Sequence, residues 1–253
     1  MRALLRLVGM LAVATLGLQL WFCLRIALMT AVAPQSTTFE RSEIWRLLLE
    51  KHEIAWAQES VPRSRLSDNL RRAVIASEDA GFFDHHGVDW DAVEKAWDKN
   101  QKAEARVEAQ ASRVAPRHAA SVASARPQAV AKVIGGSTLS QQLAKNLFLS
   151  GERSILRKGQ ELVITFMLEL ELGKDGILTT YLNNVEWGEG VFGAEAAARH
   201  YFRVDAARLS PAQAARLAVM LPAPKRFEKL PNSPYVAARS ATIVTRMGAV
   251  EKR

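Results

Sequence analysis

The hydrophobic pattern of the chain begins with a long apolar segment near the N-terminus. Residues 7–24, LVGMLAVATLGLQLWFCL, carry no charge and a single amide, Gln19. At a rise of about 1.5 Å per residue, a helix of this length nearly crosses a hydrocarbon layer of about 30 Å. Arg2 and Arg6 precede it, which favours a cytoplasmic N-terminus and an exported body. We expect residues 1–33 to form a cytoplasmic tip and a single transmembrane anchor.

A cleaved signal peptide is the alternative for this segment, because Ala31-Val32-Ala33 resembles a cleavage site. Pro34 follows at once and should obstruct cleavage, so a retained anchor is favoured. Residues 34–66 then hold scattered apolar positions and two prolines. They predict a juxtamembrane linker with one short, loosely attached helix at EIWRLLLE.

From Ser67 onward the apolar positions recur with helical spacing, and capping residues mark where helices begin. Ser67 is a candidate N-cap, Thr138 and Gln141 fit a capping box, and SPAQ at 210–213 places a proline after a serine N-cap. No segment alternates convincingly as a strand, so residues 67–253 are predicted to be mainly α. The helix expected at 154–172 should bury the stripe Leu162, Val163, Phe166, Met167 and Leu170.

Residues 98–133 differ from the rest of this body. They are rich in Ala, Ser, Arg and Gln and nearly devoid of large apolar side chains. Such a segment buries too little apolar surface to offset its ordering entropy. We expect a mobile, basic insertion here.

Composition narrows the classes of partner. The 253 residues carry a net charge of +8 and a pI near 9.9, which suits nucleic acid, an anionic membrane or a phosphorylated substrate. An anchor that exports the body makes nucleic acid the least suitable of these, and we expect none. Cys23 is the only cysteine, so an intramolecular disulfide and a cysteine-cluster zinc site are excluded.

A candidate proton-transfer group lies in AVIASEDAGFFDHHG. Helical spacing places Leu70, Val74 and Glu78 on one stripe. A carboxylate on an apolar stripe is desolvated, which raises its pKa and suits general acid or base chemistry. A solvent-exposed pair of acids at a helix end is the alternative. His85 and His86 are adjacent, face different ways and have no third ligand near, so a turn or packing role is favoured over a metal site.

The stretch GGSTLSQQLAKNL, residues 135–147, combines glycines, hydroxyls, amides and a lysine at a helix start. The free N–H groups of such a start form an anion site. Thr138, Gln142 and Lys145 share one polar face, whose function is either solvation or binding of a sugar or phosphate. Farther along, Arg157 and Lys158 stand three or four residues from Glu161. They form either surface ion pairs or a carboxylate set among phosphate-binding cations.

The segments EDAGFFDHHG, GGSTLSQQLAKN, RKGQE and YLNNVEWGEGVFGAEAAARHYF occur in the order found in glycosyltransferase family 51. The chain resembles this family over about residues 66–226. The resemblance implies a lysozyme-like, mainly α glycosyltransferase domain beside the membrane. It implies polymerisation of lipid II into β-1,4-linked glycan strands, with release of undecaprenyl diphosphate. The expected location is the cell inner membrane, with one membrane pass and the catalytic domain in the periplasm.

The resemblance also assigns roles to individual positions. Glu78 matches the general base that deprotonates the acceptor's GlcNAc 4-hydroxyl, which attacks C1 of the donor's MurNAc with inversion. Glu161 matches the second carboxylate, at the diphosphate end, and Lys145 and Arg153 match diphosphate ligands. The other matches to cleft or supporting positions are Ser137, Gln141, Gln142, Arg157, Lys158 and Asn183.

Two positions depart from the family pattern. Lys95 stands where the family has an arginine, which keeps the charge but loses the bidentate fork at a phosphate. Thr179 replaces a common glutamate, which removes a local ion pair. A divalent cation, Mg or Mn, is compatible with departure of the diphosphate, but no dedicated ligand set is visible and no metal site is assigned.

Two rival functions remain open from the sequence. A lytic glycosidase on a similar fold would need a general acid but no diphosphate site. A non-catalytic, membrane-anchored scaffold would carry the carboxylates incidentally. The expected partners are lipid II, the growing glycan strand and the membrane, with cell-wall synthesis or division proteins as a further class.

Overall fold

A computed structural model describes residues 1–114, 136–149, 151–152 and 154–250. The chain divides into two compact units, Met1–Gly87 with Thr138–Arg253, and Val88–Ser137. The helices of the first unit are α1 (Arg2–Met29), α2 (Thr38–Lys51), α3 (Asp68–Glu78), α5 (Leu139–Phe148), α6 (Ile155–Glu171), α7 (Gly173–Asn184), α8 (Ala194–Phe202), α9 (Pro211–Met220), α10 (Pro224–Glu228) and α11 (Pro234–Met247). Its short elements are the strands β1 (Ala57–Gln58), β2 (Glu186–Gly188) and β3 (Val191–Phe192) and the 3-10 turns η1 (Arg63–Arg65) and η3 (Ala206–Arg208). The second unit holds α4 (Trp90–Val114).

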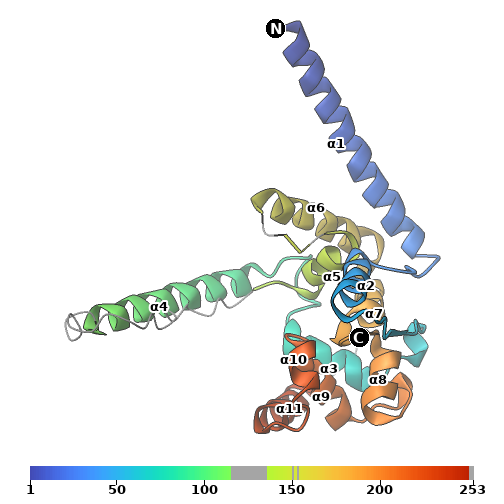
Figure 1. The fold of residues 1–253 in the computed structure, drawn as a ribbon, viewed down its shortest axis with the longest axis vertical. Helices are drawn as coiled ribbons and strands as arrows, with labels where there is room; N and C mark the ends of the chain where they lie inside the picture. The colour runs from blue at the N-terminus through green and yellow to red at the C-terminus, as the bar shows by residue number, and fades with distance from the viewer. Residues whose placement is uncertain (115–135, 150, 153, 251–253) are drawn as a thin grey trace. The chain divides into compact units, whose positions relative to one another are not determined.

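The apolar N-terminal segment forms one long helix, α1, seen in blue in Figure 1. Its length and mean hydropathy of 2.0 are sufficient to cross a membrane. Near its C-terminal end, α1 packs on the body through Phe22 and Ile26, which are buried. Gln19 and the α6 residue Gln160 exchange two side-chain hydrogen bonds, of 2.9 and 3.0 Å. Helix α1 is therefore joined to the body by specific polar and apolar contacts.

The predicted capping residues begin their helices as expected. Ser67 caps α3, and the Thr138–Gln141 and Ser210–Gln213 pairs form capping boxes at α5 and α9. The core forms where α3 packs against α9 and α11, and where α5 packs against α6 and α7. Leu139, Leu143 and Leu147 turn inward along α5. The mainly α body is confirmed.

The predicted buried stripe of α6 is wrong. The side chains that α6 buries are Glu161, Ile164, Thr165 and Leu168, whereas Phe166 and Leu170 are exposed. Ile155 and Leu156 at its start are also exposed, by 92% and 87%. The helical period was right, but the more apolar face points away from the protein interior. Spacing cannot distinguish a face that meets the core from one that meets another apolar medium.

A small sheet was also missed. β3 pairs in parallel with β1 and antiparallel with β2. Strands of two or three residues are too short to show alternation, so the pattern gave no signal. Gly190 and Gly193 flank β3 with positive φ angles, and a Cβ at Gly190 would lie 2.0 Å from the Ala55 carbonyl oxygen. The glycines of EWGEGVFG thus serve this tight hairpin.

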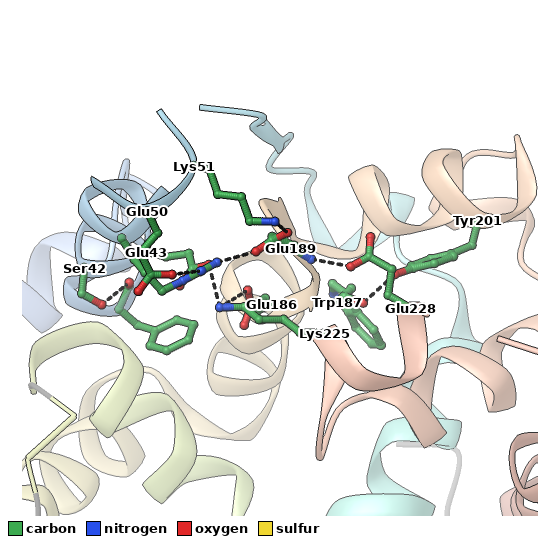
Figure 2. Close-up of polar contacts among 12 residues, drawn as sticks. Ser42, Glu43, Glu50, Lys51, Glu186, Trp187, Glu189, Tyr201, Lys225 and Glu228 are labelled. Carbon is green, nitrogen blue, oxygen red and sulfur yellow. Dashed lines mark hydrogen bonds and ion pairs between the residues drawn. The ribbon is translucent and has the colours of Figure 1, made fainter. Parts of the chain in front are cut away.

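The helix expected to be loosely attached, α2, is held by an ionic cluster (Figure 2). We call Glu43, Arg46, Glu186, Glu189 and Lys225 the α2 cluster. Lys225 of α10 contacts Glu43 at 2.6 Å and Glu186 at 3.4 Å. Arg46 contacts Glu43 at 2.5 Å and Glu189 at 2.7 Å. Because these charges join α2 to the hairpin and to α10, the loose linker expected over residues 34–66 is replaced by an integral helix and strand.

The second unit begins earlier than the expected insertion and is more regular. α4 runs from Trp90 to Val114, so the first part of the segment 98–133 is helical rather than irregular. Its Ala, Glu, Gln, Lys and Arg residues are good helix formers, so intrinsic propensity favours a helix here although large apolar side chains are scarce. Residues 115–133 of the expected insertion lie outside the described residues.

Candidate active site

Glu78 ends α3 and meets the polar face of α5. Gln142 donates a hydrogen bond from Nε2 to Glu78 Oε2, at 3.2 Å. Desolvation by the surrounding protein raises the pKa of Glu78, and nearby Asp79 adds to the rise. The hydrogen bonds from Gln142 and Ser77 and the charge of Arg239 act in the opposite direction and do not cancel it. The sequence prediction of a desolvated carboxylate on the stripe of Leu70 and Val74 is consistent with this placement.

A buried tyrosine fixes the orientation of the Gln142 amide. Tyr181 of α7 is 1% exposed and donates its hydroxyl to Gln142 Oε1, at 2.9 Å. Burial raises the pKa of Tyr181 well above its ordinary value, so the hydroxyl stays protonated as a donor. With its oxygen occupied in this way, the amide must present its NH₂ group to Glu78. Nothing in the local sequence pattern predicted this role for Tyr181.

The start of α5 is not a free anion site. Asp79 Oδ2 accepts a hydrogen bond from the Leu139 N–H at 3.0 Å, and Thr138 Oγ1 accepts one from the Gln141 N–H at 3.2 Å. The protein's own carboxylate and hydroxyl therefore take up these helix-start donors, which corrects the expectation of free N–H groups there. His85 Nε2 lies 3.0 Å from Asp79 Oδ1, in agreement with a packing role.

Cations gather around the second carboxylate. We call Lys145, Arg157, Lys158 and Glu161 the cleft cluster. Glu161 is 3% exposed, accepts a hydrogen bond from Arg157 Nη1 at 3.3 Å, and contacts Lys158 Nζ. The charges of Glu161, Arg157 and Lys158 act on Lys145 of α5. Desolvation by neighbouring protein atoms lowers the pKa of Lys145, although the residue is still exposed at the surface. Three cations against one carboxylate leave an excess of two positive charges.

One donor in the cleft cluster has no protein partner. Arg157 Nε is buried and unpaired among the described residues. A buried N–H without an acceptor is costly unless a ligand or water completes it. The cluster therefore has both the charge and a free donor for an anionic ligand.

α5 brings Glu78 and the cleft cluster to one side of the fold. Gln142 contacts Glu78, and Lys145, three residues later on the same face, faces Glu161. Three residues correspond to about 4.5 Å along a helix axis. The α5 residue that contacts the base candidate and the α5 residue that belongs to the cleft cluster are thus less than one helical turn apart. Placing a base and fixed cations beside one α-helix suits transfer of a group from an anionic leaving group.

The remaining predicted site residues have different surroundings. Gln141 completes the capping box, and Asn183 hydrogen-bonds the Val61 backbone at 3.0 and 2.9 Å, so both amides support the fold. Lys95 and Ser137 belong to the second unit, where both are exposed. Arg153 lies outside the described residues.

A divalent cation at this site would lack a dedicated set of ligands. Within residues 1–114, 136–149, 151–152 and 154–250, no three His, Cys, Asp or Glu side chains are grouped to hold a metal. Glu161 is already occupied by Arg157 and Lys158. The described residues around the cleft cluster therefore do not fit a resident ion.

Comparison with known proteins defines the class of the chain. The transglycosylase family matches residues 48–112 and 113–248. The biosynthetic peptidoglycan transglycosylase of Paraburkholderia xenovorans (strain LB400) is 45% identical over 96% of this chain and 90% of its own length. The protein of the same name from Burkholderia thailandensis is 47% identical over 96% and 85%. That from Burkholderia lata is 48% identical over 94% and 86%.

The chain therefore belongs to the transglycosylase family. The family resemblance seen in the sequence motifs, the lysozyme-like and mainly α fold, and the assignment as a glycosyltransferase enzyme are confirmed. The apolar α1 agrees with a membrane-anchored member of the family.

Proposed function

We propose that this chain is a peptidoglycan glycosyltransferase that polymerises lipid II. Glu78 takes the proton from the 4-hydroxyl of the acceptor GlcNAc. The oxygen forms a bond to C1 of the donor MurNAc, and the bond from C1 to the diphosphate breaks. The electron pair leaves with undecaprenyl diphosphate, and attack from the opposite face inverts the α-linked donor to a β-1,4 bond.

The surroundings of Glu78 support its role as the base. A raised pKa makes a carboxylate a stronger proton acceptor at near-neutral pH. The Tyr181–Gln142 pair holds Oε2 of the carboxylate, while Oε1 has only a long contact of 3.5 Å from the Ser77 hydroxyl and can still accept from the acceptor hydroxyl. Tyr181 and Gln142 are positioning residues in this scheme, since they act on Glu78 rather than on the sugar.

The excess positive charge of the cleft cluster carries the proposal. A departing diphosphate gains negative charge as the bond to C1 breaks, and fixed cations stabilise that charge without reorganisation. Lys145, Arg157 and Lys158 would bind the diphosphate, with Glu161 holding the cations in place. The buried Arg157 Nε supplies a donor still in need of an acceptor. By the family match, Arg153 would join them.

The exposed apolar face of α6 supports a substrate drawn from the membrane. α6 is hydrogen-bonded through Gln160 to Gln19, within the apolar part of α1. Its residues Ile155, Leu156 and Leu170 are each more than four-fifths exposed. Lipid would cover this face at low cost, whereas water would not. The cleft would then lie beside the bilayer, within reach of a polyprenyl-linked donor.

The proposed location is the cell inner membrane, with one pass and the body in the periplasm. Arg2 and Arg6 on the N-terminal side of α1 support this orientation. Protease added to spheroplasts should then degrade the body but spare a tag fused at Met1. Protection of the body from the protease would refute the orientation. Cell-wall synthesis or division proteins stay a predicted class of partner.

Glu78→Gln tests the reaction. The substitution keeps the size of the side chain and its contact with Gln142 but removes the base. We expect polymerisation of labelled lipid II, resolved by product size, to fall by at least about two orders of magnitude. Glu53→Gln, an exposed acid outside the site, is the matched control. Near-normal activity of Glu78→Gln would favour a scaffold, and digestion of sacculi without use of lipid II would favour a lytic glycosidase.

A further inference from the structure

A second cavity lies where α1 leaves the body. It has a volume of about 780 Å³, within the range of small-molecule sites. Met29–Ala31, Ala33 and Pro34 line one side and Ser60–Arg63 line another. The α7 residues Gly176, Thr179, Thr180 and Asn183 form a third side. Tyr181, which contacts the Gln142 of the active site, projects from a different face of α7. The cavity is therefore separate from the cleft cluster.

The position of the cavity along α1 places it at the depth of lipid headgroups. The uncharged segment ends at Leu24, and Arg25 stacks over Trp21 with its guanidinium carbon 5.5 Å from the ring centroid. Tryptophan and arginine at the end of an apolar helix are typical of the membrane interface. The cavity residues Met29 and Pro34 lie five and ten residues after Leu24. A membrane crossed by α1 would thus present headgroups at the cavity.

The cavity contains acceptors that the protein leaves unpaired. Asn184 is 1% exposed, and its Oδ1 has no partner among the described residues, although its Nδ2 donates to the Thr180 carbonyl. Glu171 Oε2 is buried and also unpaired within that part of the chain. The weakly donating Cys23 thiol is near Glu171, but no described cation lies within ion-pair distance. A buried carboxylate oxygen without a donor is stabilised when a cationic group completes it.

A guanidinium completes the set of charges. Arg63 lines the cavity with its side chain about half exposed and contacts Asp175 through Nε at 3.3 Å. Asp175 is also bound by Arg71, so the two arginines satisfy this carboxylate. Among the described residues, the outer N–H groups of Arg63 have no partner and are available to a further anion. The cavity thus offers an unpaired carboxylate and a partly exposed guanidinium together.

We propose that this cavity binds the headgroup of a phospholipid carrying a primary amine, phosphatidylethanolamine. The ammonium group has three N–H donors for Glu171, and the phosphate accepts from Arg63. The acyl chains would follow the exposed side of α1. A choline headgroup has no N–H donor for the unpaired oxygen, and a glycerol headgroup has no positive charge for the carboxylate. The inference rests on α1 as the membrane anchor and goes beyond the polymerase reaction.

Native mass spectrometry of the full chain tests this proposal. The detergent-solubilised protein is titrated with phosphatidylethanolamine, phosphatidylcholine or phosphatidylglycerol, and the bound lipid is counted. We expect phosphatidylethanolamine to be retained preferentially. Glu171→Gln should weaken its retention about tenfold, the effect of losing a charge-assisted hydrogen bond. Retention of the other two lipids should not change.

Two variants keep the test decisive. Glu53→Gln removes an exposed acid outside the cavity and should bind as the unaltered chain does. Thr179→Trp fills the cavity from α7 and should reduce binding while Glu171 is intact. Equal retention of all three lipids, or unchanged retention in both cavity variants, would overturn the proposal. Because binding is counted without lipid II, failure here is distinct from loss of polymerisation in Glu78→Gln.

Discussion

Two ionic clusters of this protein contain the same residue types but differ in the sign of their net charge. The α2 cluster sets Arg46 and Lys225 against three carboxylates, so it is one positive charge short. Its ion-paired neighbours Glu50 and Lys51 add one charge of each sign and leave this deficit unchanged. The cleft cluster sets three cations against Glu161 alone and has two positive charges in excess. A deficit of positive charge favours protonation of a carboxyl group, whereas an excess favours an external anion.

The pKa values follow this difference. Burial raises the pKa of Glu186 to about 7, since the single contact with Lys225 does not compensate for the lost water. Burial alone would also raise the pKa of Glu43, but hydrogen bonds from Arg46 and Lys225 outweigh it and lower that pKa. Among the described residues, Glu186 Oε1 of the α2 cluster and Arg157 Nε of the cleft cluster both lack a hydrogen-bond partner. The raised pKa of Glu186 allows a proton to make up the missing charge in the α2 cluster, whereas only an external acceptor can complete the Arg157 donor. An ionic cluster indicates a binding site when its charges and donors do not balance internally.

Removing a cation from each cluster should separate the two roles most strongly. Lys145→Met is expected to lower polymerisation of lipid II by about two orders of magnitude or more, as for loss of one fixed charge beside a leaving group. Its melting temperature should be unchanged or higher, because the variant relieves repulsion from Arg157 and Lys158. A gel-based polymerisation assay and thermal unfolding measure both effects. Full activity of Lys145→Met would refute the diphosphate role.

The matched change in the α2 cluster is Lys225→Met. It leaves the buried Glu43 with Arg46 alone and should lower the free energy of unfolding by about 2 to 3 kcal/mol. This is less than for a fully buried pair, since the Lys225 side chain is 36% exposed. Denaturant unfolding gives the value, and activity per folded molecule should stay within about twofold. A large loss of activity without a loss of stability would place this cluster in the catalytic machinery.

A smaller effect is expected from Tyr181→Phe. The variant removes the hydroxyl that fixes the Gln142 amide but keeps the ring in its buried position. Loss of one hydrogen bond that orients Glu78 should lower kcat about tenfold. If the effect passes through Gln142, Tyr181→Phe should add little to Gln142→Ala. Full additivity of the two substitutions in kcat would show that they act independently.

A further expected effect is a pH dependence of stability. The ordinary pKa of a glutamate is 4.5, and that of Glu186 in the folded state is about 7. Between these values the unfolded chain has released this proton and the folded chain retains it. The contribution of Glu186 to the free energy of unfolding therefore falls as pH rises through this window. Glu186→Gln should flatten that slope, measured by unfolding at pH 5, 6 and 7. An identical slope in the variant would assign the pH dependence to another group.

Local signals predicted much of the fold. Helix starts were predictable because Ser67, Thr138 and Ser210 cap them through contacts within the next three residues. The orientation of α6 was not predictable from the sequence, because an apolar stripe can face either the protein core or another apolar medium. The three short strands depend on pairing between Ala57–Gln58 and residues more than a hundred positions away.

The residue types of the candidate site were predictable from the sequence, but most of the hydrogen bonds that connect them were not. Glu78, Glu161 and Lys145 carry the resemblance. Lys145 belongs to α5, and Glu78 of α3 and Glu161 of α6 interact with the polar face of that helix. The use of Asp79 to cap α5 and of Tyr181 to fix Gln142 depends on tertiary contacts. A buried tyrosine beside the YLNN motif is visible in the sequence, but nothing local shows where its hydroxyl points.

The paired amides of Gln19 and Gln160 have a mechanical consequence. Because each side chain both donates to and accepts from the other, turning α1 about its axis by one residue would break both hydrogen bonds at once. Helix α1 and the body therefore tilt together. In a bilayer crossed by α1 as proposed, the tilt of this single helix would set the orientation of the catalytic body relative to the membrane surface.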